Sequence, residues 1–416
     1  MPTFPRTPAL AAPTCRWMLW LVLAAAPLSV AQAAVLSLDS ALAKAFANNP
    51  ELAAARWEID IAQGARQQAG LLPNPVLSVD AEDTRRDSRT TSVKLSQALE
   101  LGGKRGARVE VASRGQELAA LELERRGNQL RADVLQAYYA ALRAQERTQL
   151  AGRSLALAER GVSVAQGRVN AGKASPVEAT RAQVQLAEVR LELSRGQMEQ
   201  DTAYQQLASI TGSAATDFSA VQEPERAPST LPASAQLLSR LPETAELRLA
   251  EQEIVQREAS LGLERAQRIP DLDVSIGSQY DAGARERVNL VGLSMPLPLF
   301  NRNQGNLLSA ARRADQARDL RNATELRLRS ETRQALEQWN TARGEVQAFN
   351  QTILPAAQRA VDSATRGFEM GKFSFLEVLD AQRTLIGARS QYLAAVAQTT
   401  DARVRIERIY GDLSRW

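Results

Sequence analysis

Two short stretches of the sequence carry carboxylates that could act on a solute. They are residues 172–178 (GKASPVE) and 371–377 (GKFSFLE), and they start 199 residues apart, at 172 and at 371. Asp380 follows Glu377 by three residues, so both carboxylates lie on one face if this segment is helical. Such groups attract cations by charge alone and need no nucleophile. The pattern therefore indicates electrostatic rather than catalytic chemistry.

A structural role competes with this functional one for two of the carboxylates. Glu178 follows Ser175 by three residues, and Glu377 follows Ser374 in the same way, which is the spacing of a capping box at the start of a helix. We favour capping as the primary role of both glutamates. Asp380 has no capping position and is the better candidate for a functional carboxylate.

Catalytic and metal-binding groups are scarce beyond residue 33. Cys15 is the only cysteine and histidine is absent, so the later chain lacks the usual nucleophile, general base and soft metal ligands. It contains no Walker loop, GxGxxG element or credible catalytic triad. The 51 Lys and Arg residues nearly balance the 47 Asp and Glu residues, which does not favour nucleic-acid binding. We expect no enzyme, no cofactor, no bound metal and no nucleic-acid partner.

Residues 1–33 have the pattern of a secretory signal peptide. Arg6 and Arg16 precede an apolar run at 17–30 that is too short to span a bilayer, and 31–33 (AQA) matches a cleavage site. No later apolar run approaches the length of a membrane helix. If the exported chain lies in a membrane, we expect it to use β-strands.

The carboxylate-bearing stretches join long helical segments. A glycine, Gly172 or Gly371, can end the incoming helix in a left-handed conformation. The segment from Lys104 to Asn170 contains no proline, and a helix of about 67 residues is about 100 Å long. So long a helix must pack beside others, as in a coiled coil or helical barrel. Each stretch is therefore predicted to be the tip of a helical hairpin.

Alternating segments predict β-hairpins at 76–99 and 272–295, with strands about as long as a tilted membrane strand. The alternation slips at Leu290 and Val291, which indicates a bulge. Four strands per chain fall short of about eight in the smallest barrels, so the chain must oligomerise to close one. We expect the polar strand residues to face a wet lumen rather than to select an ion. They are Ser78, Asp80, Glu82, Lys94, Asp273 and Ser275.

The order of these elements repeats along the chain. We expect a first structural repeat at 34–212 and a second at 243–416, separated by a proline-containing linker at 213–242. Each repeat holds a helix, a β-hairpin, a long helix, a tip and a return helix. The predicted fold is mainly α with a small β part and an internal two-fold repeat.

This plan resembles the TolC-like outer membrane efflux proteins along the whole chain beyond residue 33. The stretches 72–75 (LPNP), 96–105 (SQALELGGKR) and 296–306 (PLPLFNRNQGN) are similar to the cobalt–zinc–cadmium resistance branch. The resemblance implies a homotrimer in the lipid of a Gram-negative outer membrane, with a 12-stranded β-barrel. It also implies a periplasmic α-barrel tunnel of long antiparallel helices. The tips would meet a periplasmic adaptor (membrane fusion) protein that links the channel to an inner-membrane RND-type pump.

The resemblance also assigns roles near the tips. It implies that Glu377 and Asp380 line a periplasmic gate, where three chains would form stacked carboxylate rings. Arg383, three residues further on, is a candidate to neutralise Asp380 on the same helix face. The residues expected to contact the adaptor are Gly172, Lys173, Ser175, Glu178, Gly371, Lys372, Phe373, Ser374 and Phe375.

Local roles stay open for some tip residues. Lys173 and Lys372 can offset the dipole at the end of the incoming helix. Phe373 and Phe375 can pack as a local staple instead of forming an adaptor-binding surface.

The predicted function is that of a passive outer-membrane duct in a tripartite system for RND-type export of divalent heavy-metal cations. One alternative is a periplasmic adaptor or coiled-coil scaffold, although an adaptor would usually have one helical hairpin with a small β-domain. Another is the same type of channel exporting drugs or polypeptides.

Overall fold

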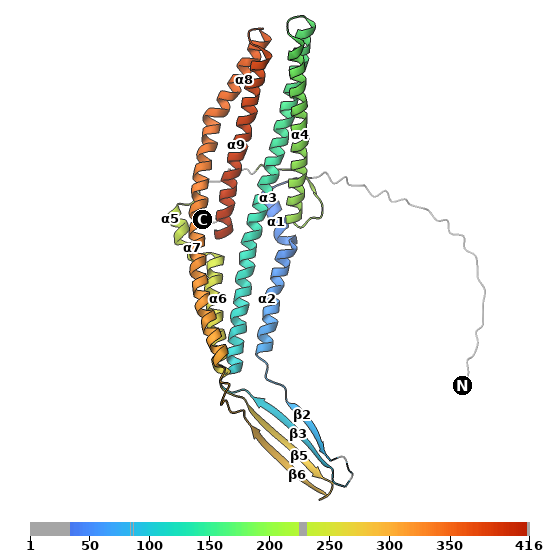
Figure 1. Cartoon of the computed structure of the whole chain (residues 1–416), viewed down its shortest axis with the longest axis vertical. Coiled ribbons are helices and arrows are strands. Elements are labelled where there is room, and N and C mark those ends of the chain that lie inside the picture. Colours follow the sequence, from blue (N-terminus) through green and yellow to red (C-terminus); the bar gives the residue numbers. More distant parts are fainter. Residues whose placement is uncertain (1–33, 84, 86, 224–230, 414–416) are drawn as a thin grey trace, which may run out of the picture.

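The computed structural model describes residues 34–83, 85, 87–223 and 231–413, so the predicted signal peptide lies outside the described residues. Long helices run along most of the molecule, and a sheet lies beyond one end of them (Figure 1). In chain order the elements are β1 Ala34–Leu36, α1 Leu38–Asn48, α2 Pro50–Ala69, β2 Val76–Glu82, β3 Thr90–Leu99, α3 Lys104–Asn170, α4 Pro176–Ile210, β4 Phe218–Val221, α5 Ser234–Ser239, the 3-10 helix η1 Leu241–Glu243, α6 Ala245–Ala266, β5 Leu272–Asp281, β6 Glu286–Ser294, α7 Gln304–Ala348, the π-helix η2 Phe349–Ile353, α8 Leu354–Glu369 and α9 Phe375–Tyr410.

The longest helices form two hairpins whose tips lie at the end of the molecule opposite the sheet (Figure 1). α3 returns as α4, and α8 returns as α9, while α9 also packs beside α3. Along α3 the buried alanines Ala144, Ala151, Ala158 and Ala165 recur every seven residues. This is the spacing of a coiled-coil seam, and small side chains let neighbouring helices approach closely. No helix among the described residues is long and apolar enough to cross a membrane.

The two hairpins differ in continuity. α3 runs unbroken for 67 residues, whereas the helix leading to the second tip is interrupted by the π-helix η2. Pro355 lies at the start of α8, directly after η2. A proline has no N–H to donate to the carbonyl of the preceding turn, and the wider π spacing accommodates that loss. The helix leading to the second tip is therefore interrupted directly before Pro355.

The larger sheet has the strand order β2-β3-β5-β6, with every neighbouring pair antiparallel. β5 and β6 pair residue by residue without a shift of register. The bulge predicted at Leu290 and Val291 is therefore wrong. Leu290 keeps its place in the ladder opposite Gly277.

The segment predicted to be a linker contains ordered elements that sequence reasoning missed. β4 pairs in parallel with β1, and α5 follows at Ser234–Ser239. The Tyr138 hydroxyl, on α3, lies 3.0 Å from the Leu36 carbonyl and 2.6 Å from the Gln222 carbonyl. Burial raises the pKa of Tyr138 to about 12, so its hydroxyl stays protonated and can donate. This contact fastens the small sheet to the long helix.

Candidate functional site

The four-stranded sheet has two chemically different faces. One side carries rows of apolar residues across the strands, such as Leu77, Leu95, Ile276 and Val291. The registers place all six predicted lumen residues on the opposite side. These are Ser78, Asp80, Glu82, Lys94, Asp273 and Ser275.

The apolar face of the sheet is open rather than covered. Leu77 is 66% exposed, Ile276 is 57% exposed and Val291 is 80% exposed. In a water-soluble protein the apolar face of a sheet is the covered one. The observed arrangement suits a sheet whose outer face meets hydrocarbon and whose inner face lines water.

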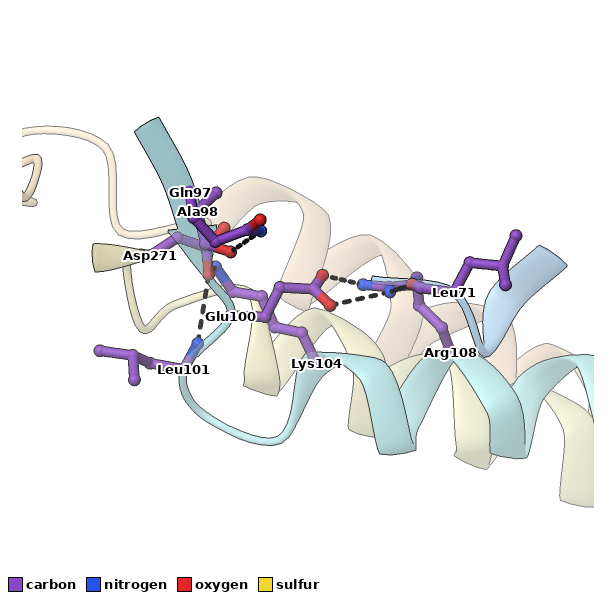
Figure 2. Close-up of polar contacts among 8 residues, drawn as sticks. All are labelled: Leu71, Gln97, Ala98, Glu100, Leu101, Lys104, Arg108 and Asp271. Atoms are coloured by element: carbon purple, nitrogen blue, oxygen red, sulfur yellow. Dashed lines mark hydrogen bonds and ion pairs between the residues drawn. The ribbon is translucent and has the colours of Figure 1, made fainter. Parts of the chain in front are cut away.

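The sheet is fastened to the helices by charged groups around Asp271, which precedes β5. The Asp271 carboxylate accepts a hydrogen bond from the Leu101 backbone N–H at 3.3 Å and forms an ion pair with Lys104 at 2.7 Å (Figure 2). The contact joins the start of β5 to the corner between β3 and α3.

A second ion pair lies beside the first at the same junction. Glu100 accepts hydrogen bonds from both terminal nitrogens of Arg108, one of them at 3.0 Å (Figure 2). Arg108 also donates to the Leu71 carbonyl at 3.3 Å, which ties in the end of α2. The hydrogen bond from Arg108 holds the pKa of Glu100 below its usual range. These contacts set the direction of the sheet relative to the helices.

The second tip has the turn and cap that its sequence predicts. Gly371 is left-handed at φ 75°. Glu377 accepts hydrogen bonds from the Ser374 N–H at 2.6 Å and from its hydroxyl at 3.0 Å, which completes a capping box. Asp380 is exposed. Of the two carboxylates, Glu377 is therefore engaged by the helix start, and Asp380 faces solvent.

The first tip shares the turn but not the complete cap. Gly172 is left-handed at φ 68°. Ser175 accepts from the Val177 N–H at 3.4 Å. The capping box predicted between Ser175 and Glu178 is wrong, because the serine bonds one residue earlier in the helix. One carboxylate oxygen of Glu178 is buried without a hydrogen-bond partner among the described residues.

The exposed residues of the tips include both lysines. Lys173 and Lys372 are exposed, and no ion pair holds either within the described part of the chain. The two phenylalanines differ from each other. Phe375 is 4% exposed, and its ring centroid lies 5.6 Å from that of Phe368, whereas Phe373 is 43% exposed. Local packing therefore accounts for Phe375, and only Phe373 retains a large free surface.

Arg383 was expected to pair with Asp380, and it does not. Its Nη2 lies 2.9 Å from the Gln185 amide oxygen and 3.6 Å from a carboxylate oxygen of Glu188, both on α4. The long arginine side chain reaches across to the neighbouring helix, where two acceptors are available. Arg383 therefore links the two hairpins instead of neutralising the carboxylate one turn back on its own helix.

A second link between the hairpins was not predicted. The Arg168 guanidinium lies 4.7 Å from the centre of the Phe368 ring, and its Nη1 donates to the Phe368 carbonyl at 3.3 Å. The position equivalent to Arg168 in the second repeat, 199 residues on, is Gly367. This contrast between a long cation and a glycine was visible in the sequence and could have drawn attention to Arg168.

Comparisons with known proteins extend over nearly the whole chain. The family described as "Outer membrane efflux protein" matches residues 41–213 and 238–412. The chain is 40% identical to the cobalt-zinc-cadmium resistance protein CzcC of Cupriavidus metallidurans, over 90% of both chains. It is 28% identical to the nickel-cobalt-cadmium resistance protein NccC of Alcaligenes xylosoxydans xylosoxydans, over 60% of this chain and 56% of that protein. The crystal structure of the outer membrane protein VceC from Vibrio cholerae has a TM-score of 0.75 at 20% identity, covering 89% of this chain and 95% of that one.

Proposed function

The chain belongs to the outer membrane efflux protein family and is an efflux channel of the outer membrane; from this premise we propose that it is the exit duct of a tripartite system exporting divalent heavy-metal cations. The names of the two relatives, which specify resistance to cobalt, zinc, cadmium and nickel, support this cargo. The main observation that supports a duct is a sheet whose apolar face is open, with Leu77, Ile276 and Val291 each more than half exposed, and whose other face carries the polar and charged residues.

The proposed assembly is a homotrimer in which three sheets close a 12-stranded barrel. β2 and β6 are the edges of the sheet in one chain. Unpaired strand edges are not tolerated in hydrocarbon, and four strands are too few to close a barrel, which needs about eight or more. Pairing β6 of one copy with β2 of the next removes both edges.

A stripe on α4 supports closure of the helical part as well. Ala179, Ala182 and Val189 are buried on this helix. Exposed residues recur every seven positions on another face, at Val177, Val184, Leu191 and Met198. A seven-residue apolar repeat is the mark of a helix–helix seam. We propose that a helix of the next copy covers this stripe and so continues the wall of a periplasmic tunnel.

The division of the chain into two repeats remains our proposal. The family match falls in two segments, 41–213 and 238–412, which supports repeats at 34–212 and 243–416 on either side of the segment 213–242. We place both hairpin tips at the periplasmic end, where an adaptor linked to an inner-membrane RND-type pump would dock. The exposure of Lys173, Lys372 and Phe373 supports contact there.

We assign the gate to the start of α9. Three copies would bring Glu377 and Asp380 together in a narrow mouth, where carboxylates attract cations. Glu377 is part of the helix cap, so Asp380 is the carboxylate whose charge can be removed while the cap stays intact. Arg383, through Gln185 and Glu188, holds the two hairpins against each other at this level.

Assembly and topology are tested together. The mass of the purified protein in detergent should be that of three chains, and a conducting monomer would rule the proposal out. An impermeant thiol reagent added to intact cells should label a cysteine introduced at Ser88 but not one introduced at Ser374, because it reaches only the outer loop. Labelling at Ser374 but not at Ser88 would invert the topology.

The gate and the cargo need separate measurements. Asp380→Asn should lower cation preference in single-channel recordings and weaken block by multivalent cations, because each trimer loses three charges. Unchanged selectivity would remove Asp380 from the constriction.

For the cargo, cells lacking the channel should accumulate zinc, cobalt or cadmium, and the wild-type channel should reverse this. If only drug or polypeptide export is lost, the heavy-metal assignment fails.

A further inference from the structure

Charge is divided between the faces of the sheet at its loop end. Two adjacent rows of paired residues cross the four strands there, one on each face. The row on the polar face contains three carboxylates, and the row on the apolar face contains an arginine, a tyrosine and no carboxylate. The first row is Glu82, Thr90, Asp281 and Glu286, and the second is Ala81, Thr91, Tyr280 and Arg287.

Arg287 is the charged member of the second row. It is exposed, and no ion pair or hydrogen bond of its side chain occurs among the described residues. The carboxylate of Asp281 is taken up by its own turn, where it accepts from the Gly283 N–H at 2.8 Å and the Ala284 N–H at 3.0 Å. Glu286 precedes Arg287 in β6 and points to the other face. Arg287 therefore presents an uncompensated charge on the apolar side.

The position of Arg287 along the strand matches the edge of a membrane. Leu272 and Tyr280 bound the apolar face of β5, and the eight residue steps between them span about 27 Å of extended strand. With a tilt of about 40° this strand rises about 21 Å, which covers most of the apolar band of about 25 Å in outer-membrane proteins. Tyrosine is enriched where hydrocarbon meets headgroups. An arginine at that depth can reach the headgroups while its stem stays over apolar surface.

We propose that Arg287 and Tyr280 form a binding surface for the phosphate of an outer-leaflet lipid headgroup. The inference rests on the proposed insertion of this sheet in the outer membrane. A guanidinium offers a planar fork that binds phosphate oxygens in pairs, and the tyrosine hydroxyl is a second donor. The acyl chains would lie along Ile276 and Val291 on the same face. Carboxylates on the polar face repel phosphate and keep the lipid outside the duct.

Native mass spectrometry of the detergent-solubilised protein with added diphosphoryl lipid A tests the proposal. Arg287→Gln should weaken binding about fivefold, the factor for removing one basic residue from a membrane surface. Arg287→Lys should give an intermediate affinity, because it keeps the charge and loses the fork. The matched control is Lys94→Gln, which removes one positive charge from the opposite face of the same sheet. It should bind lipid A as the wild type does.

The outcomes separate this inference from the proposed function. Equal affinity of Arg287→Gln and the wild type for lipid A, or an equal loss of affinity in Lys94→Gln, would overturn the proposed lipid-binding surface. So would unchanged binding of dephosphorylated lipid A by the wild type, or full competition by inorganic phosphate, which would indicate a site for free anions. Conductance in planar bilayers tests the channel by itself: a non-conducting wild type that still binds lipid A through Arg287 would refute the duct and not the lipid surface. The variant's mass in detergent must match the wild type's, as a check on folding.

Discussion

The two hairpin tips have the same type of turn but pack different side chains around it. Each has a left-handed glycine followed by a serine that caps the return helix. In the first tip, Arg168 occupies one position and Ala174 another. Their counterparts in the second tip, 199 residues on, are Gly367 and Phe373. The first tip therefore combines the large Arg168 with the small Ala174, and the second tip combines the small Gly367 with the large Phe373.

The structure gives a physical reason for this exchange. A side chain added at Gly367 would place its Cβ only 2.2 Å from the Phe373 ring, so a glycine is needed beneath that ring. In the first tip, Arg168 instead extends to Phe368 of the other hairpin. The second tip is thus packed internally, and the first tip contributes the bridge. The same turn therefore carries two different arrangements of large and small side chains in this chain.

The largest expected effect is at the packed tip. Phe375→Ala should lower the local free energy of opening by about 3 to 5 kcal/mol, because it empties a buried aromatic site. Amide hydrogen exchange in the first turns of α9 measures this opening. Met370→Ala, which shortens an exposed apolar side chain of the same tip, is the control and should change exchange little. Equal protection in wild type and Phe375→Ala would mean that the second tip is not held by its apolar cluster.

A smaller effect tests the paired exchange directly. Gly367→Ala should cost about 1 to 3 kcal/mol through overpacking against the Phe373 ring. The double variant Gly367→Ala, Phe373→Ala should recover most of that loss, because it removes the ring that the new methyl group meets. Hydrogen exchange at residues 371–377 is again the measurement. Additive losses in the double variant would show that the two positions are independent and that the exchange is a coincidence.

The caps allow a matched comparison of the two glutamates. Glu377→Ala removes a capping-box partner and should cost about 1 kcal/mol. Glu178→Ala should cost nothing or stabilise slightly, because one oxygen of Glu178 is buried without a partner. Protease nicking and amide exchange at each tip report the two effects separately. If both substitutions destabilise their tips equally, the first tip has a cap that the geometry does not reveal.

The smallest expected effect concerns the bridge. Arg168→Gln should weaken contact between the hairpins by about 0.5 to 1 kcal/mol, the lower part of the range for a cation over an aromatic ring. Exchange should rise at Phe368 and its neighbours, whereas the turn at 371–374 stays protected. Arg153→Gln on α3 is a control that removes the same charge elsewhere on that helix. A uniform rise across both tips would contradict a local bridge.

Local sequence signals predicted the elements well. The glycines of the tips, the length of α3 and the alternation of the strands depend on residues within a few positions of each other, where backbone conformation and periodicity act. The same signals missed β1, β4 and their contact with Tyr138, because a parallel pair of three- and four-residue strands has no local pattern and forms only through a distant helix. They also predicted a bulge at Leu290 and Val291 that is absent, since the register of β6 is set by its pairing with β5 and not by its own alternation.

The sequence alone determined where the chain turns, which segments are helix or strand, and that one face of the sheet is apolar. Only the tertiary structure decided which charged groups remain available. Glu377 is engaged by a cap, Glu178 is not, and Arg383 bonds to α4 rather than to Asp380. Spacing along a helix limits which groups can meet, but the partner that Arg383 takes depends on acceptors of α4, about two hundred residues away in the chain. Such contacts arise from the packing of whole hairpins, which no short stretch of sequence specifies.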